Sequence, residues 1–348
     1  MMLAIQKTLK RTVPIIVAGL FVVSLWLPGH VLAAGSLVAH WAFDETSGTT
    51  AADSSGNNYD GINTDATIST DVPTTAFANP RSLSFNGSTA VVEAPAQAAL
   101  TGNHSRTISL WFKTAFDSAN QGIFDSGSIG TNTAMEIYTV AANGAGLAPP
   151  TNPGGIAIVM WDNDIYVPLG IENVANNQWH FLTFTYDEAT QQATLYFDGV
   201  AEQAYLWDGG GWSGSLQSQP FTTVNPLNTT ANDVLIGQVR TGYFNSGNTF
   251  FTGSIDDVRI YDVAITPEQV GNLSDGSNDL SGPVSGGASP VSNPSSGGTQ
   301  QSPVATLADA GIPVIATTLG SASLLLLAII AKFALPRGRV KNKKLLQD

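Results

Sequence analysis

Residues 107–113 read Thr-Ile-Ser-Leu-Trp-Phe-Lys, and this stretch decides the fold class. Ile108, Leu110 and Phe112 occupy every second position, so a strand places all three on one face. Residues 179–186 read Trp-His-Phe-Leu-Thr-Phe-Thr-Tyr, a longer mixed run that is typical of a strand covered on both sides. The period of the apolar pattern is therefore two rather than 3.6.

Turn residues separate these runs at short intervals. Asp198-Gly199 lies between residues 193–197 and 200–202 and predicts a hairpin, because Asp-Gly tolerates the positive φ of a tight turn. Asn86-Gly87 separates two more short strands. Only residues 266–269, Thr-Pro-Glu-Gln, have a helix start, with Thr as N-cap and Gln completing a capping box. Many short strands and almost no helix predict an all-β, two-sheet antiparallel sandwich or jelly roll.

The beginning of the chain has the features of a secretory signal. Lys7, Lys10 and Arg11 precede the uncharged residues 12–28, and Val-Leu-Ala-Ala follows at 31–34. A basic segment, an apolar segment and small residues at a cleavage site predict a signal peptide over residues 1–33.

The end of the chain predicts a membrane anchor. Residues 312–331 carry no charge, and about 30 Å of helix is enough to cross a bilayer. We expect a transmembrane helix over residues 312–335 and a basic cytoplasmic tail over 336–348. The domain between the two apolar ends is then extracellular, anchored in the cell membrane through the C-terminal helix.

The segment between the apolar ends is strongly acidic. Residues 35–311 contain 26 Asp and Glu but only five Lys and Arg, a formal charge of −21. Such a field disfavours nucleic acid and anionic lipid as partners. Oxygen-rich acidic surfaces suit hard cations such as Ca²⁺. The chain has no cysteine, which excludes disulfides and thiolate metal sites.

Composition changes at residue 275. Residues 275–306 are nearly all Ser, Gly, Pro, Asn and Gln, and such a stretch buries too little apolar surface to fold. We expect a stalk there and one folded domain over residues 36–274.

Seven motifs run through this domain in a fixed order. They are 41–45 (Trp-Ala-Phe-Asp-Glu) with 53–57, 82–87 (Ser-Leu-Ser-Phe-Asn-Gly), 108–112, 179–180 with 186–187, 195–199 (Leu-Tyr-Phe-Asp-Gly), 236–237, and 251–261. In this order they resemble the laminin-G-like (concanavalin A-like) jelly-roll domains. The resemblance implies two antiparallel sheets packed face to face, with a curved face and loops that commonly bind glycans or proteins. It does not identify the ligand, because the same fold serves lectins, adhesion modules and glycosidases.

The resemblance also implies a structural Ca²⁺, held by a carboxylate of the last strand and oxygens of the first loop. On this chain that marks Asp256 first, with Asp44 and Asp53 as further ligands. Asp256 has the same parity as Val258 and Ile260, so we expect it to point toward the core, where a lone carboxylate needs a partner or a cation. The alternative is an Asp satisfied by backbone N–H groups.

Two tryptophans lie in a polar segment over residues 206–232. Trp207 and Trp212 flank Asp-Gly-Gly-Gly, and an aromatic face on a loop suits stacking against a sugar ring. Tyr243 is a further candidate for ligand contact. The alternative is that both tryptophan rings only hold a long loop against the sandwich.

Catalysis has little support in the sequence. The hydrolytic branch of the family has Glu-x-Asp-x-x-Glu on one strand, and the chain has no such run. Asp162 and Asp164 are the nearest pair on one face; they fit either a polar hairpin turn or a contact to sugar or metal. We therefore expect a non-catalytic recognition module for glycans. The alternatives are a protein-binding surface adhesin and, third, a glycoside hydrolase.

Overall fold

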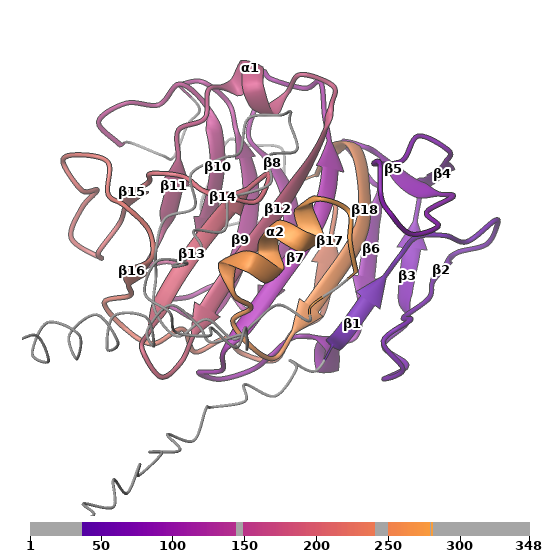
Figure 1. Cartoon of the computed structure of the whole chain (residues 1–348), viewed down its shortest axis with the longest axis horizontal. Coiled ribbons are helices and arrows are strands. Elements are labelled where there is room, and N and C mark those ends of the chain that lie inside the picture. Colours follow the sequence, from indigo (N-terminus) through magenta and orange to yellow (C-terminus); the bar gives the residue numbers. More distant parts are fainter. Residues whose placement is uncertain (1–36, 144–148, 241–249, 279, 281–348) are drawn as a thin grey trace, which may run out of the picture. The chain divides into compact units, whose positions relative to one another are not determined.

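The computed structural model describes residues 37–143, 149–240, 250–278 and 280. These residues form two antiparallel sheets, which confirms the predicted all-β sandwich (Figure 1). Sheet 1 contains β14 (Val200–Ala201), β13 (Gln192–Phe197), β12 (Trp179–Asp187), β7 (Arg106–Lys113), β18 (Thr252–Tyr261), β5 (Ser82–Asn86) and β4 (Thr67–Ser69), with β1 (Leu37–Trp41) on β18 and β16 (Phe221–Thr222) on β13. Sheet 2 contains β15 (Tyr205–Leu206), β11 (Ile165–Val167), β10 (Gly155–Val159), β9 (Ala134–Val140), β8 (Gln121–Gly127), β17 (Val234–Ile236), β6 (Val91–Ala94), β3 (Gly61–Thr64) and β2 (Thr50–Ala51).

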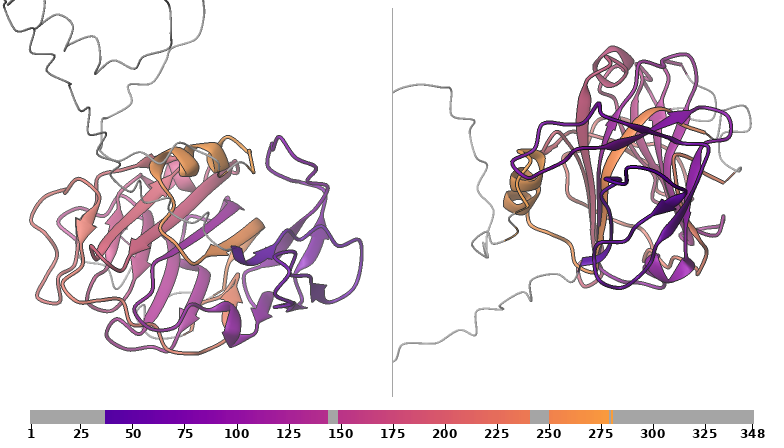
Figure 2. Two further views of the ribbon diagram at one scale, coloured as in Figure 1. Left: turned by 60° about the horizontal axis from the view of Figure 1, so that its bottom comes forward. Right: turned by 90° about the vertical axis from the view of Figure 1, so that its right-hand side faces the viewer.

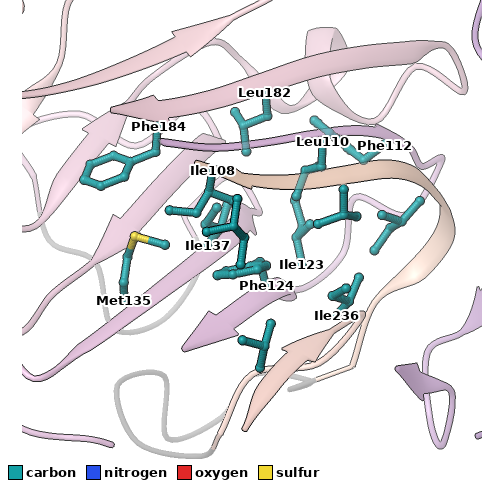
Figure 3. Packing of buried hydrophobic residues seen from close by; sticks show 14 of the residues in the cluster. Ile108, Leu110, Phe112, Ile123, Phe124, Met135, Ile137, Leu182, Phe184 and Ile236 are labelled. Carbon is teal, nitrogen blue, oxygen red and sulfur yellow. The ribbon is translucent and has the colours of Figure 1, made fainter. Parts of the chain in front are cut away.

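The core lies between the sheets and follows the alternation of the strands. Ile108, Leu110 and Phe112 of β7 point inward with Leu182 and Phe184 of β12, and they meet apolar side chains of sheet 2 (Figure 3). All five are buried. Burial of each of these large apolar side chains stabilises the sandwich by about 1.5–3 kcal/mol.

The predicted turns and the predicted helix are present. Asp198 and Gly199 have φ values of 49° and 79° between β13 and β14, as a tight primed turn requires. Helix α2 (Pro267–Ser274) has Thr266 as N-cap and a complete capping box with Gln269. The other two helical segments in the described ranges are single turns, η1 (Ala96–Ala98) and α1 (Ile171–Val174).

Helix α2 covers the outer face of sheet 1, as the right-hand view of Figure 2 shows. Val270 and Leu273 pack there against Trp111, Phe181 and other apolar side chains. The ordered contacts continue past the predicted domain end at residue 274. Leu280 packs against the same cluster, and its carbonyl accepts a hydrogen bond from Gln269 Nε2 at 2.5 Å. The folded part of the domain therefore includes the first residues of the predicted stalk.

In the part of the chain that the structure describes, none of the helices is both long and apolar enough to cross a bilayer. The predicted signal peptide (1–33) and the predicted transmembrane helix (312–335) lie outside the described residues.

Candidate functional site

The outer face of sheet 2 carries a cluster of aromatic side chains. Tyr138 of β9, Tyr166 of β11 and Tyr205 of β15 are buried there, and Trp161 and Trp212 pack against them. These residues are on the outer face because they alternate with the core residues of their strands. Tyr166 and Tyr205 stack at 6.5 Å between ring centroids.

The two loop tryptophans join this cluster. The Trp207 and Trp212 rings meet edge to face at 5.7 Å, and the Trp212 ring meets Tyr166 in the same way at 6.5 Å. Both tryptophans stay partly exposed. The ring of Trp212 therefore has one part packed on the sheet and one part open to a ligand.

The two predicted acidic residues, Asp162 and Asp164, have different environments. Asp164 is buried, and its Oδ1 accepts hydrogen bonds from the N–H groups of Met160 (2.7 Å) and Trp161 (2.8 Å). It thereby braces the turn between β10 and β11, which is the hairpin alternative of the sequence analysis. Asp162 is partly exposed, and its carboxylate lies against Gly209, which stands between Trp207 and Trp212 in the sequence. Asp162, Trp207 and Trp212 are thus brought together, whereas Tyr243 lies outside the described residues.

Two further carboxyl groups on this face are absent from the sequence analysis. Asp125 and Glu136 are directly paired across β8 and β9, and both are buried. Arg240 donates to Asp125 Oδ1 at 2.8 Å. Glu136 Oε2 accepts from the Tyr138 hydroxyl at 2.7 Å, but Oε1 has no hydrogen-bond partner among the described residues.

Burial raises the pKa values of Asp125 and Glu136 above their ordinary values. It raises the pKa of Asp125 to about 6, although hydrogen bonds and the charge of Arg240 act against it. It raises the pKa of Glu136 to about 8, because there the single hydrogen bond from Tyr138 is a weaker compensation. Apolar Met135 and Ile137 alternate with Glu136, and this pattern predicts that the Glu136 carboxyl group lies on the face of the strand away from the core.

The second candidate site lies at the last strand, where one expectation was wrong. Ile255, not Asp256, lies in the core with Val258, because β18 has a bulge between Asp256 and Arg259 and Asp257 adopts a φ of 51°. Asp256 pairs in register with Trp111 of the outer cluster. The Asp256 side chain therefore points to the outer face of sheet 1.

Asp256 is nevertheless fully buried and incompletely satisfied. Its Oδ2 accepts from Asn79 Nδ2 at 2.8 Å, and its Oδ1 has no hydrogen-bond partner in the described part of the chain. Burial raises the pKa of Asp256 to about 8, and the charges of Asp257 and Asp44 act in the same direction. Burial also raises the pKa of Asp44, whose Oδ1 accepts from the Arg81 N–H at 3.3 Å.

Asp53 has a different environment. Its two oxygens accept hydrogen bonds from the N–H groups of His40, Ser55 and Tyr59 and from the Ser55 hydroxyl, at 2.8 to 2.9 Å. Burial acts to raise the pKa of Asp53, but these hydrogen bonds hold it below its usual value. Asp53 thus braces its own loop.

The donors around Asp256 fit a hard cation only in part. Asp44 and Asp256 interact electrostatically, and the unpartnered Asp256 Oδ1 lacks a positive group. However, the described residues contain no group of three or more His, Cys, Asp or Glu side chains that could hold a metal ion. A Ca²⁺ bound there would need amide or backbone oxygens to complete its shell of six to eight ligands.

Several solved structures are similar to this chain. Domain 4 of AbnA, an extracellular GH43 arabinanase from Geobacillus stearothermophilus solved with arabinotriose, shares 20% identity, with 69% of this chain and 98% of that chain covered and a TM-score of 0.38. The binding domain of Paraclostridial mosquitocidal protein 1 shares 14% identity, with 69% of this chain and 52% of that chain covered and a TM-score of 0.42. The binding domain of botulinum neurotoxin serotype D shares 13% identity, with 70% of this chain and 51% of that chain covered and a TM-score of 0.40. The chain thus spans about half the length of these two toxin domains. None of these likenesses identifies a ligand.

No curated protein matches the chain. A family model matches residues 86–271, more than half of the sequence, and it describes the concanavalin A-like lectin/glucanases superfamily in its laminin-G form. This match confirms the resemblance that the motifs indicated. The chain belongs to the concanavalin A-like lectin/glucanase superfamily.

Proposed function

We propose that the chain is a non-catalytic recognition module that binds glycans on the outer face of sheet 2. The observation that carries this proposal is the partly exposed edge-to-face pair of Trp207 and Trp212 on a base of buried tyrosines. A half-packed indole loses little freedom when a sugar ring stacks on its open part. The Asp162 carboxylate beside the pair accepts hydrogen bonds from sugar hydroxyls.

A glycan array probed with the purified full-length chain tests this proposal. Trp212→Ala should weaken binding of the best glycan about tenfold, because a stacked ring contributes about 0.5–1.5 kcal/mol beyond its buried area. Phe221→Ala is the matched control, since Phe221 is a partly buried ring at the edge of sheet 1. Asp162→Asn is the second variant if Trp212→Ala lowers the melting temperature.

Three results would change the conclusion. Unchanged affinity in Trp212→Ala and Asp162→Asn would place the glycan site elsewhere. An array without any bound glycan would favour the second candidate, a protein-binding surface adhesin, since the same exposed rings suit a protein partner. New reducing ends after incubation with a bound polysaccharide would show hydrolysis.

A non-catalytic role agrees with the environment of the carboxyl pair on this face. A glycosidase needs an acid and a second carboxylate on both sides of the scissile bond. Asp125 and Glu136 are adjacent, but both are fully buried and Asp125 is bound by Arg240. Neither group reaches a sugar from these positions.

We further propose that Ca²⁺ stabilises the domain through Asp256 and Asp44. The support is the unpartnered Asp256 Oδ1 beside a second carboxylate. Bound Ca²⁺ would supply the positive charge that these groups lack. Asp53 is a weaker candidate ligand, because its loop already occupies both of its oxygens.

The proposed location is the cell surface, with export by residues 1–33 and anchoring by residues 312–335. The support is the order of basic and apolar segments at the two ends of the sequence. Protease added to intact cells should remove the domain and spare a short C-terminal fragment. Digestion of the tail with a protected domain would show the opposite orientation.

A further inference from the structure

A cavity of about 440 Å³ lies on sheet 1, away from the aromatic cluster of sheet 2. It is bounded by the end of β7, the beginning of β18 and strand β5, with Asp71, Phe116 and Asn177 among its wall residues. This volume falls in the range of small-molecule sites.

Three polar side chains form the floor of this cavity. Ser254 of β18 pairs in register with Ser84 of β5 on one side and with Lys113 of β7 on the other. Residues directly opposite in antiparallel strands project to the same face, so the three side chains stand in one row. In the described part of the chain, the hydroxyls of Ser84 and Ser254 have no hydrogen bond to another residue, so both are available to a ligand.

Lys113 of the floor and Asp71 of the wall form a balanced pair of charges. Lys113 Nζ lies 2.8 Å from Asp71 Oδ2, and the Trp179 indole N–H donates to Asp71 Oδ1 at 3.1 Å. The hydrogen bond from Lys113 holds the pKa of Asp71 below its usual value. Lys113 keeps further N–H donors for a ligand, and a carboxylate oxygen accepts more than one hydrogen bond.

We infer that this cavity is a second ligand site and that it binds a neutral polyhydroxylated molecule, namely a single sugar unit. Two free hydroxyls, an ammonium donor, a carboxylate acceptor and the Asn177 amide match a ligand that both donates and accepts at several positions. The Lys113–Asp71 pair leaves no net charge to select an ion, which favours a neutral sugar over an anion or a cation. This site does not depend on the proposed site at Trp212.

Saturation-transfer NMR of the full-length chain tests the inference with five probes: glucose, galactose, arabinose, N-acetylglucosamine and glycerol. Ser84→Leu fills the cavity from its floor and should reduce the signal of the bound sugar about tenfold. Trp212→Ala should leave that signal unchanged, because Trp212 lies on the other sheet. The melting temperature of each variant serves as the folding control.

Asp71→Asn is the second variant, because Asp71 is exposed and its change does not disturb the core. It should weaken the sugar signal several-fold while the domain stays folded. A signal that Trp212→Ala abolishes and Ser84→Leu preserves would overturn the inference, as would the absence of saturation transfer to all five probes. Binding of glycerol equal to that of every sugar would also overturn it. Loss of glycan binding on the array in Trp212→Ala, by contrast, would test only the proposed glycan site on sheet 2.

Discussion

The outer faces of the two sheets both bury carboxyl groups, and in each case one group is compensated and its neighbour is not. On sheet 1, Asp257 contacts Arg259 at 2.8 Å and His40 at 2.6 Å, whereas Oδ1 of the adjacent Asp256 has no hydrogen-bond partner among the described residues. On sheet 2, Asp125 contacts Arg240, whereas Glu136 has the Tyr138 hydroxyl as its only hydrogen-bond partner within the described ranges.

The compensated groups connect distant parts of the chain. Asp257 holds His40 of β1, and the other ring nitrogen of His40 lies 2.7 Å from the Ser54 hydroxyl. Since ionised Asp257 only accepts hydrogen bonds, His40 donates to it from Nε2. Hydrogen bonds and the charges of Arg259 and His40 outweigh burial and hold the pKa of Asp257 below its usual value. This network pins the first loop to the last strand.

The two groups without a counter-charge, Asp256 and Glu136, can instead hold a proton or a cation. A buried carboxyl without a counter-ion keeps a proton or takes a cation, because its ionised form is poorly solvated. Asp256 has a second carboxylate, Asp44, close enough to interact with it, and so we propose a cation there. Asp125, the neighbour of Glu136, already has Arg240 as its counter-ion, and so we expect Glu136 to hold a proton.

The largest effect is expected from Arg259. Arg259→Met leaves Asp257 buried without its main counter-charge, and breaking a buried pair in this way costs about 3–5 kcal/mol. Chemical denaturation of the full chain measures the loss of free energy of unfolding. The double variant Arg259→Met, Asp257→Asn should recover much of the loss, because no unpaired charge remains. Equal stability of the single variant and the unaltered chain would show that the network contributes little.

The next effect concerns Ca²⁺ at Asp256. A cation that binds only the folded state adds about 2.7 kcal/mol at a concentration of 100 Kd. A chelator should therefore lower the melting temperature by several degrees. In Asp256→Ala the melting temperature should be low and insensitive to the chelator, whereas Asp125→Asn, the control on sheet 2, should keep the chelator effect. A melting curve that the chelator does not move would refute calcium binding.

The strands and turns could be predicted because their causes are local. Alternation in residues 107–113, the Asp-Gly turn at 198–199 and the capping box at 266–269 each depend on a few consecutive residues. The proximity of candidate site residues could be predicted only where they share a loop, as Trp207 and Trp212 do.

The remaining site residues depend on contacts that no local pattern encodes. The Asp256 carboxylate meets Asn79, which lies 177 residues away in the sequence. The bulge at Asp257 reverses the parity on which the orientation of Asp256 was predicted, and an Asp in a strand pattern gives no sign of a positive φ. The alternation around Glu136 orients its side chain away from the core, but the local sequence does not encode its pairing with Asp125 of another strand.

The smallest effect, for a change of one pH unit, is expected from Glu136. Burial raises the pKa of Glu136 from 4.5 to about 8, so between these values the folded chain keeps a proton that the unfolded chain has lost. Stability from this group is therefore complete below about pH 4.5 and decreases as the pH rises toward 8, by at most about 1.4 kcal/mol per pH unit. Asp125 and Asp256, whose pKa values burial also raises, act in the same direction.

Glu136→Gln removes this one contribution, so its free energy of unfolding should fall less steeply between pH 5.5 and 7.5 than that of the unaltered chain. Denaturation curves at several pH values measure the difference. Glu93→Gln is the matched control, because Glu93 stands on the same sheet in register with Leu235, the neighbour of Asp125, but is exposed. Parallel pH profiles for Glu136→Gln and the unaltered chain would mean that Glu136 is ionised in the folded state. The unpartnered Oε1 would then have to hold a cation, and the two outer faces would be alike.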